Sequence, residues 1–134
     1  MKKIAGIFLV STILFSCNLL LKHKPTINEI LVASADSLNK RCPKQLDALT
    51  KITSVSVLPN KTLQFNYATE FDTTKFDMAT VKEKVKAKLF DEFINTPSCK
   101  MFRDSSVTII YCYNNTNGDF LFKEVFSPDT YKGY

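Results

Sequence analysis

Four cysteines and one histidine are the side chains of this 134-residue sequence that most readily perform nucleophilic or metal chemistry. They are Cys17, His23, Cys42, Cys99 and Cys112. No two cysteines have the Cys-x-x-Cys spacing of redox and zinc sites, and the only histidine precedes the part of the chain that we expect to fold. A nucleophile needs a nearby base, and zinc needs grouped nitrogen and sulfur ligands. The sequence therefore excludes Ser-His-Asp hydrolysis and the common zinc sites, and it predicts no metal and no cofactor.

Acidic residues gather in one predicted loop. Glu70, Asp72 and Asp77 precede the second predicted helix, and a pair of carboxylates is what glycosidases use. The interpretation that we favour is a solvated loop in which Asp77 lies near a helix N-terminus, where a negative charge is stabilised. The alternative is a small periplasmic enzyme or enzyme inhibitor that acts through the loop around Asp72. We assign no catalytic residue.

The first 17 residues have the pattern of an export signal. Lys2 and Lys3 form a basic start, and residues 4–16 form an apolar stretch that is shorter than the ~20 residues of a membrane-spanning helix. Leu14-Phe15-Ser16-Cys17 resembles the lipobox of bacterial lipoproteins in its aliphatic residue, its small residue and its cysteine. The resemblance implies cleavage between Ser16 and Cys17 and attachment of acyl chains to the Cys17 thiol, which would anchor the protein stably in a membrane.

Two alternatives to lipidation remain open. An uncleaved signal-anchor would use residues 4–21, and ordinary cleavage would leave Cys17 without lipid. All three interpretations place the domain outside the cytoplasm, with the basic start on the inner side of the membrane. By the sorting rule of enterobacterial lipoproteins, Asn18 in place of aspartate implies transfer to the outer membrane. The residues after Cys17 lack an acidic surface-export motif, which favours the side that faces the periplasm.

The rest of the chain has the composition of one small domain. The sequence is 45% hydrophobic and 12% aromatic, and it is too short for two domains. Removal of Lys2 and Lys3 reduces the 18 basic residues to 16, against 13 acidic ones. So small a surplus argues against nucleic-acid binding. We divide the chain into a signal peptide (1–16), a lipidated tether (17–25), one domain (26–127) and a loose tail (128–134).

Two helices and two hairpins are predicted within this domain. Thr26 and Glu29 form a capping box at the start of a helix that ends before Pro43. Residues 53–57 and 63–67 alternate apolar and polar side chains, as in a hairpin. Residues 77–95 have apolar side chains at helical spacing, and Thr80 with Glu83 predicts a second capping box. Residues 107–113 and 120–126 form a second hairpin around Asn117-Gly118. We therefore expect an α+β fold, in the order α-β-β-α-β-β, with a predominantly antiparallel four-stranded sheet and two helices.

The three cysteines that follow the tether allow one disulfide in an oxidising compartment. We favour a bridge between Cys42 and Cys99, because both lie at the ends of predicted helices, and we expect Cys112 to be a small buried hydrophobic residue. Connectivity cannot be deduced from the spacing of cysteines, so a bridge that involves Cys112 stays open.

The pattern of the domain also resembles a known group. The sequence from Cys42-Pro43 through Phe65-Asn66-Tyr67 and residues 107–113 to residues 118–122 is similar to small exported bacterial domains, and in outline to pilotin-like lipoproteins. Pilotins bind a segment of a secretion channel subunit and escort it to the outer membrane. The resemblance implies a membrane-anchored, non-enzymatic module that binds a protein partner in the cell envelope. It assigns no binding residue. An exposed apolar groove would favour this hypothesis, and a polar pocket with converging carboxylates would favour the enzyme.

Overall fold

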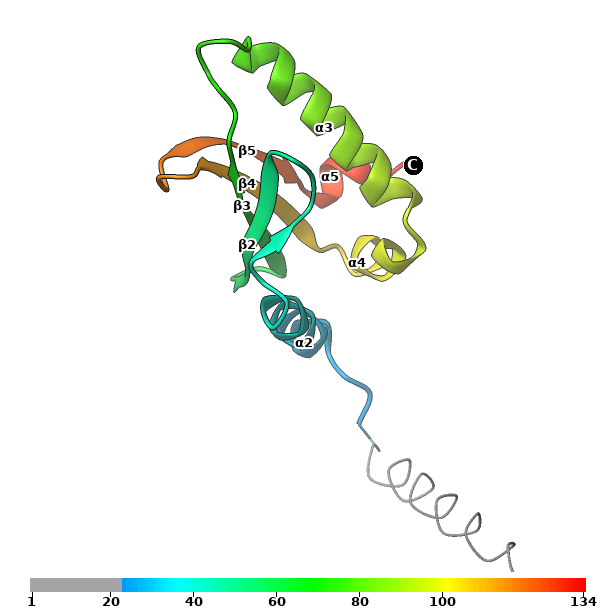
Figure 1. The fold of residues 1–134 in the computed structure, drawn as a ribbon. Helices are drawn as coiled ribbons and strands as arrows, with labels where there is room; N and C mark the ends of the chain where they lie inside the picture. The colour runs from blue at the N-terminus through cyan, green and yellow to red at the C-terminus, as the bar shows by residue number, and fades with distance from the viewer. Residues whose placement is uncertain (1–22) are drawn as a thin grey trace, which may run out of the picture.

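The computed structural model describes residues 23–134, which form a five-stranded sheet with helices on one face and along one edge (Figure 1). The signal segment, Ser16 and Cys17 lie outside the described residues. None of the helices within residues 23–134 is long and apolar enough to cross a membrane. The elements are, in chain order, α2 (Ile27–Asn39), β1 (Lys44–Gln45), β2 (Thr50–Leu58), β3 (Thr62–Thr69), α3 (Met78–Asn95), the 3-10 turn η1 (Pro97–Cys99), α4 (Lys100–Asp104), β4 (Thr108–Asn115), β5 (Phe120–Phe126) and α5 (Pro128–Tyr131).

The strands lie in the order β1-β2-β3-β4-β5, and the sheet is mixed. The two predicted hairpins are present, as the antiparallel pairs β2–β3 and β4–β5. They join through a parallel pairing of β3 with β4, from Thr62 opposite Thr108 to Thr69 opposite Asn115. The predicted four-stranded, predominantly antiparallel sheet with two helices is therefore wrong. Parallel strands need a long crossover, and here the segment that carries α3 and α4 supplies it.

Three of the additional elements are too short to give a periodic signal in the sequence. They are β1, which is two residues long, α4, which has five, and α5, which has four. α5 lies in the segment that we predicted to be a loose tail. Its Tyr131 is only 3% exposed, and the Tyr131 hydroxyl donates a hydrogen bond of 2.7 Å to the backbone oxygen of Val107. The C-terminal segment is thus packed against the domain by a buried polar contact.

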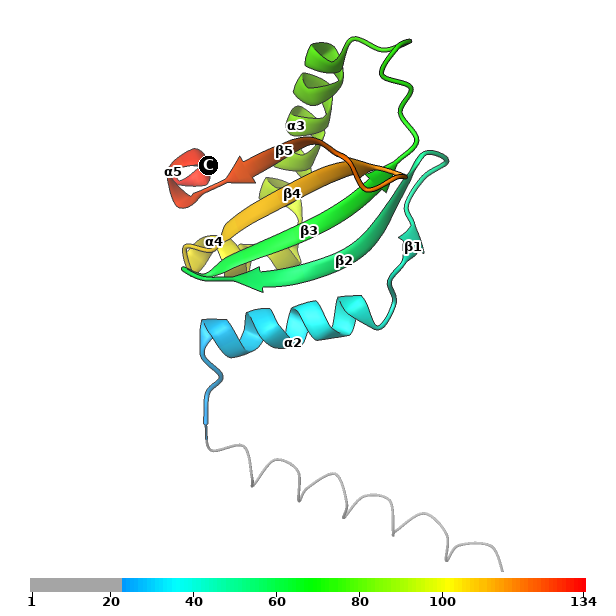
Figure 2. The same ribbon diagram turned by 90° about the vertical axis from the view of Figure 1, so that its left-hand side faces the viewer.

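The hydrophobic core lies on one face of the sheet only. The register places Leu63, Phe65 and Tyr67 of β3 beside Ile109, Tyr111 and Tyr113 of β4. α3 and α4 cover this face, whereas the opposite face lies open in Figure 2. The open face is polar on β2 and β3, where a hydrogen-bonded chain joins Gln64, Asn66 and Ser54. The alternation of side chains in the sequence correctly predicted one apolar and one polar face for the first hairpin.

The N-terminus of α3 differs from the prediction. The side chain of Asp77 accepts hydrogen bonds from the backbone nitrogens of Ala79 and Thr80, at 3.3 and 3.2 Å, and from the Thr80 hydroxyl at 2.7 Å. The helix therefore begins one turn earlier than the predicted Thr80–Glu83 capping box requires. The interpretation of Asp77 as a residue near a helix N-terminus is confirmed, and the capping box at Thr80 is wrong.

α2 packs along the outer edge of β2 rather than across the centre of the sheet (Figure 2). β1 covers this edge only beside residues 51 and 52. Further along the strand, the Asn39 side chain takes the place of a neighbouring strand. Its Nδ2 donates to the Val55 carbonyl oxygen and its Oδ1 accepts from the Val55 nitrogen, both at 2.8 Å. One amide thus satisfies two backbone groups of an edge strand that would otherwise be free to pair with another chain.

We expect Asn39→Ala to lower the free energy of unfolding by about 1–2 kcal/mol, because it removes both hydrogen bonds to Val55. Urea denaturation followed by circular dichroism measures the change. Asn28→Ala is the matched control, since Asn28 is an exposed residue of the same helix whose side chain has no hydrogen bond within residues 23–134. Equal stability of the two variants would show that the Asn39 contact contributes nothing.

Candidate functional site

An apolar groove of about 590 Å³ runs between α2 and α4. Its floor is formed by Leu63 and Phe65 of β3, and its walls come from two helices that are separate in the sequence. The wall residues are Pro25, Glu29, Ile30, Ala33, Ser34, Ser37, Leu38, Arg41, Ser98, Met101 and Phe102. Their side chains are hydrophobic or small, apart from Glu29 in the first turn of α2 and Arg41 just after its last turn. Such a groove suits an apolar segment of similar length to α2, which is about 20 Å long at 1.5 Å per residue.

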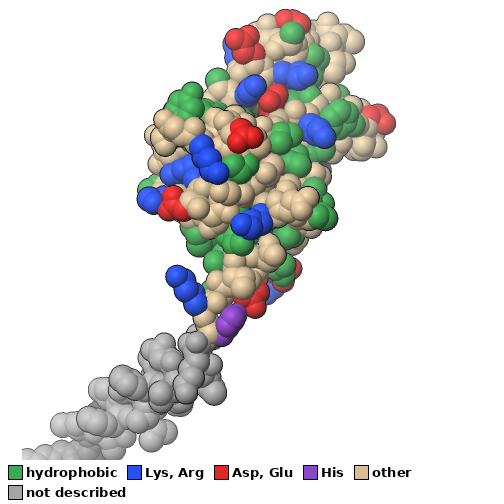
Figure 3. All heavy atoms as spheres, turned by 180° about the vertical axis from the view of Figure 1, so that it is seen from behind, with side chains coloured by type: hydrophobic (Ala, Val, Ile, Leu, Met, Phe, Trp, Pro, Cys, Tyr) green, Lys and Arg blue, Asp and Glu red, His purple; other side chains and the backbone are tan. Residues whose placement is uncertain are grey.

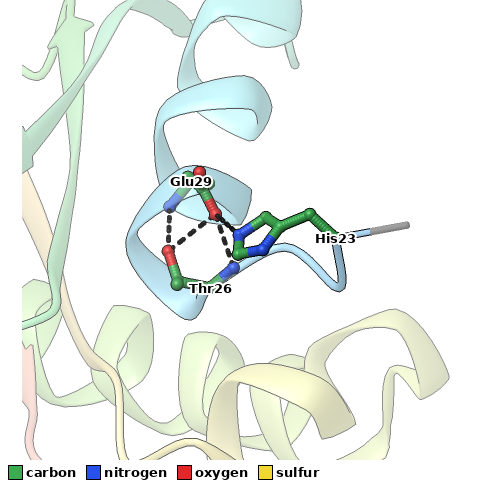
Figure 4. Close-up of polar contacts among 3 residues, drawn as sticks. All are labelled: His23, Thr26 and Glu29. Atoms are coloured by element: carbon green, nitrogen blue, oxygen red, sulfur yellow. Dashed lines mark hydrogen bonds and ion pairs between the residues drawn. The ribbon is translucent and has the colours of Figure 1, made fainter. Parts of the chain in front are cut away.

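The segment that precedes α2 meets the domain at the groove. Figure 4 shows the contacts of His23, Thr26 and Glu29. The backbone nitrogen and the hydroxyl of Thr26 both donate to Glu29 Oε2, at 2.7 and 2.9 Å, and the Glu29 nitrogen donates to the Thr26 hydroxyl at 3.3 Å. The predicted capping box is confirmed. Hydrogen bonds from Thr26 lower the pKa of the Glu29 carboxyl, which is therefore an anion at neutral pH.

His23 adds a solvent-exposed contact to this cap. Its Nε2 lies 3.5 Å from Glu29 Oε2, and its side chain is 74% exposed. It is a solvent-exposed residue, as the sequence predicted. Eight residue steps separate Cys17 from Pro25, and an extended chain of that length spans at most about 29 Å. A lipid on Cys17 would therefore hold the groove near the membrane surface.

A second hollow, of about 340 Å³, lies at the other end of the same sheet face, between α3 and the β1–β2 region. We call it the tyrosine pocket. It is lined by Leu46, Asp47, Thr50, Tyr67, Phe71, Val85, Lys88, Leu89, Glu92 and Tyr113. The two tyrosines are 8% and 6% exposed, and their rings stack with centroids 4.9 Å apart. The alternation in the sequence placed each of them on the apolar face of a predicted hairpin. A buried tyrosine hydroxyl needs a polar partner, and that requirement was the signal that could have marked them as candidate site residues.

A row of aromatic rings connects the groove with the tyrosine pocket. Phe65 of the groove stacks on Tyr111 at 5.4 Å, Tyr111 contacts Tyr67 at 6.2 Å, and Tyr113 stacks on Phe122 at 4.7 Å. Burial raises the pKa of Tyr67 and of Tyr111 well above the ordinary tyrosine value. Burial, and then the nearby carboxylates of Glu92, Asp47 and Glu124, raise the pKa of Tyr113 to about 12. All three hydroxyls are therefore protonated at neutral pH.

Local hydrogen bonds and an ion pair hold the carboxylates of Asp72 and Asp77 in the acidic loop. Asp72 accepts hydrogen bonds from the backbone nitrogen and the hydroxyl of Thr74, and it pairs with Lys75 at 3.2 Å. Asp77 caps α3. These hydrogen bonds lower the pKa of both carboxyls, the reverse of what a general acid requires. Within residues 23–134, no group of three His, Cys, Asp or Glu side chains is placed to hold a metal ion.

The predicted disulfide between Cys42 and Cys99 is not supported. Cys42, Cys99 and Cys112 are all free thiols, and no two of these described cysteines lie at disulfide distance. Cys42 and Cys99 instead pack separately against the edge of the hydrophobic core, where burial raises the pKa of the Cys99 thiol. Cys112 is half-buried and lies on the open face of the sheet, opposite Lys123 of β5. It is thus less buried than the sequence predicted.

Charge is dispersed over the part of the surface seen in Figure 3, where basic side chains alternate with hydrophobic, acidic and other side chains. The ion pairs among the described residues are also local. Lys75 pairs with Asp72, Lys88 with Glu92 and Lys100 with Asp104, each within one helical turn or loop. On this face the basic side chains therefore do not form a single cluster.

A family model for a domain of unknown function (DUF8479) matches residues 27–122. The chain belongs to this family. The sequence matches no curated protein.

The fold is shared with solved structures of low sequence identity. A protein from Pseudomonas aeruginosa that is described as secreted superposes with a TM-score of 0.67 at 10% identity, over 78% of this chain and 91% of the other. The pilotin EpsS of the Vibrio vulnificus type 2 secretion system gives 0.63 at 12% identity, over 81% and 94%. The type II secretion system pilotin AspS of Vibrio cholerae gives 0.59 at 11% identity, over 78% and 91%. The predicted pilotin-like outline is thus confirmed for the fold.

We expect the free energy of unfolding to fall as the pH rises from 10 to 12, and to fall less in Tyr113→Phe. A tyrosine with a raised pKa in the folded state contributes stability that is complete below the ordinary value of 10.0 and is lost as the pH passes about 12. Urea denaturation at pH 8, 10, 11 and 12 measures the slope for each protein. Identical slopes for the two proteins would contradict the raised pKa of Tyr113.

Proposed function

We propose that this chain is a lipid-anchored protein of the bacterial cell envelope that binds, and escorts, an apolar segment of a protein partner in the groove between α2 and α4. The proposal depends on the presence of this groove. Its floor and walls are mainly apolar, and an open apolar groove in a small domain is typical of a surface that binds another protein. The shared fold with two secretion-system pilotins supports an escort role.

The shape of the groove favours a helical segment as the bound element. α2 and the shorter α4 present two walls, and a third helix packed between them would bury an apolar stripe on Leu63 and Phe65. Glu29 and Arg41 carry opposite charges at the two ends of α2, so they would favour one direction of a helix that has a basic and an acidic end. A partner segment with apolar residues at i, i+3, i+4 and i+7 and such ends fits these features.

The anchor in this proposal is the lipobox. Signal cleavage after Ser16 and lipidation of Cys17 would leave residues 17–25 as a short tether to one domain over residues 26–127. The proposed location is the periplasmic side of the outer membrane. A tether that enters the domain beside Glu29 would place the groove next to the bilayer, where the membrane-associated part of a partner lies.

The proposal does not need an enzymatic activity. The rival interpretation required free carboxylates around Asp72, and the Asp72 and Asp77 side chains are instead held by hydrogen bonds within their own loop and helix start. We therefore assign Asp72 and Asp77 a structural role, in which they stabilise the loop and the start of α3.

Cys17→Ala is expected to abolish acylation of the protein. Metabolic labelling with an alkyne fatty acid, followed by intact mass measurement, tests this expectation in the producing bacterium. Cys112→Ala is the matched control and should be labelled like the wild type, because Cys112 lies within the folded domain. Absence of label in the wild-type protein, or equal label in the Cys17 variant, would contradict lipidation at Cys17.

Ala33→Lys is expected to reduce capture of the partner by at least about tenfold, because it places a charge in the apolar groove. Val32→Lys is the matched control, since Val32 is the neighbouring residue of α2, is 48% exposed and lies outside the groove. The measurement is quantitative affinity capture from detergent-solubilised membranes with each lipidated full-length variant. A partner that is retained by Ala33→Lys, or lost equally with both variants, would refute the groove as its binding site.

A further inference from the structure

The tyrosine pocket is separate from the groove and has no role in the proposed function. We propose that it is a second binding site, which takes a cationic nitrogen group, and that the guanidinium of an arginine side chain fits it best. The inference depends on the convergence of hydroxyl and carboxylate oxygens at an apolar pocket, and it holds whether or not the groove binds a partner.

The pocket combines an apolar wall with a polar rim. Leu46, Phe71, and Val85 with Leu89 of α3 supply hydrophobic side chains from three different places in the chain. Tyr67 and Tyr113 come from adjacent strands and line it from the sheet. The charged lining residues are Asp47 before β2 and Lys88 and Glu92 on α3. A volume of about 340 Å³ is at the small end of the range for ligand sites, which suits one side chain or one small molecule.

The tyrosine hydroxyls have hydrogen-bonding capacity that the described residues leave unused. Neither Tyr67 nor Tyr113 forms a side-chain hydrogen bond within residues 23–134, although both residues are more than nine-tenths buried. Tyr131 provides the contrast, because its buried hydroxyl donates to the Val107 carbonyl oxygen. Among the described residues, no fully buried side-chain oxygen lacks a hydrogen-bond partner, so the unpaired Tyr67 and Tyr113 hydroxyls reach the open space of the pocket. Both hydroxyls are therefore accessible to a ligand that enters it.

The charges around the pocket favour a cation. The carboxylates of Glu92, Asp47 and Glu124 all act on the Tyr113 hydroxyl, and Glu92 acts on Tyr67 as well. Lys88 is the one cation among the lining residues, and its ammonium lies 4.0 Å from Glu92 with the side chain 75% exposed. The lining therefore carries an excess of negative charge, and an anionic ligand would be repelled.

The unpaired acceptor oxygens of Asp47 and Glu92 further limit which type of cation fits the pocket. Asp47 Oδ1 accepts from the backbone nitrogens of Leu49 and Thr50, both at 2.9 Å, while Oδ2 has no partner within residues 23–134. The Glu92 side chain accepts no hydrogen bond within residues 23–134, and its Oε1 forms an ion pair of 4.0 Å with Lys88 Nζ. The acceptors thus come from separate elements, and a guanidinium presents five N–H groups in one plane. The apolar wall would contact the methylene groups of an arginine side chain.

Titration of the full chain in detergent with small probes tests the inference. The probes are Nα-acetyl-arginine methylamide, its lysine counterpart and its uncharged citrulline counterpart, and the readout is the NMR signals of Tyr67 and Tyr113. We expect saturable shifts of both signals with the arginine probe, and affinity at least about tenfold weaker for citrulline. No saturable shift with arginine, or equal affinity for citrulline, would overturn the proposal.

Variants separate recognition of the cation from effects on the fold. Glu92→Gln is expected to weaken arginine binding by roughly tenfold, because it removes a charge-assisted interaction. Glu83→Gln, on the same helix but outside the pocket, should bind like the wild type. Equal affinity of the Glu92 variant and the wild type would overturn the role of the pocket.

A further comparison distinguishes the two sources of the cation. Tighter binding of acetyl-Gly-Arg-Gly-amide than of free arginine would assign the guanidinium to a protein chain, and the reverse would assign it to a free small molecule. Both results support the site, and failure of both ligands to bind would overturn it. Partner capture by Ala33→Lys and these titrations are independent measurements. Each can therefore refute its own proposal without affecting the other.

Discussion

The parallel pairing of β3 with β4 is the contact on which the rest of the structure depends. It joins two hairpins into one sheet and fixes their register from Thr62 opposite Thr108 onward. Because parallel neighbours cannot be linked by a tight turn, residues 70–107 must cross one face of the sheet. α3 and α4 lie in that crossover, so the same pairing decides which face is covered and leaves the other face open. The groove and the tyrosine pocket both lie on the covered face because the crossover helices form one wall of each.

The covered face is divided by its aromatic row into two chemically different regions. At one end, Leu63 and Phe65 form an apolar floor between α2 and α4. At the other end, Tyr67 and Tyr113 present hydroxyls beside carboxylates of α3 and the β1–β2 loop. Between these ends, neighbouring rings lie with centroids 4.7 to 6.2 Å apart. The aromatic row thus separates the groove from the tyrosine pocket.

Local sequence patterns predicted the individual helices and hairpins, but they did not predict contacts between residues that are far apart in the sequence. The Thr26 capping box, both hairpins and the extent of the 77–95 helix follow from residues close together in the chain. The β3–β4 pairing joins residues 46 positions apart, and nothing in either hairpin specifies its neighbour. Asp77 and Thr80 both suit an N-cap, and in the structure Asp77 caps the helix while Met78 packs against the core. The groove could not be predicted because Met101 and Phe102 belong to a helix of five residues without a detectable period.

The long separation of β3 and β4 also bears on the order of folding. Each hairpin closes a short loop, whereas joining the two requires the closure of a loop that spans residues 70–107, and contacts so distant in sequence form slowly. Until they join, the inner edges of β3 and β4 are unpaired and carry the largest aromatic side chains of the sheet. Two chains at that stage could pair with each other as readily as each pairs with itself. The newly synthesised chain is thus most vulnerable to misassembly before its two hairpins pair, and the crossover that covers one face of the sheet also delays that pairing.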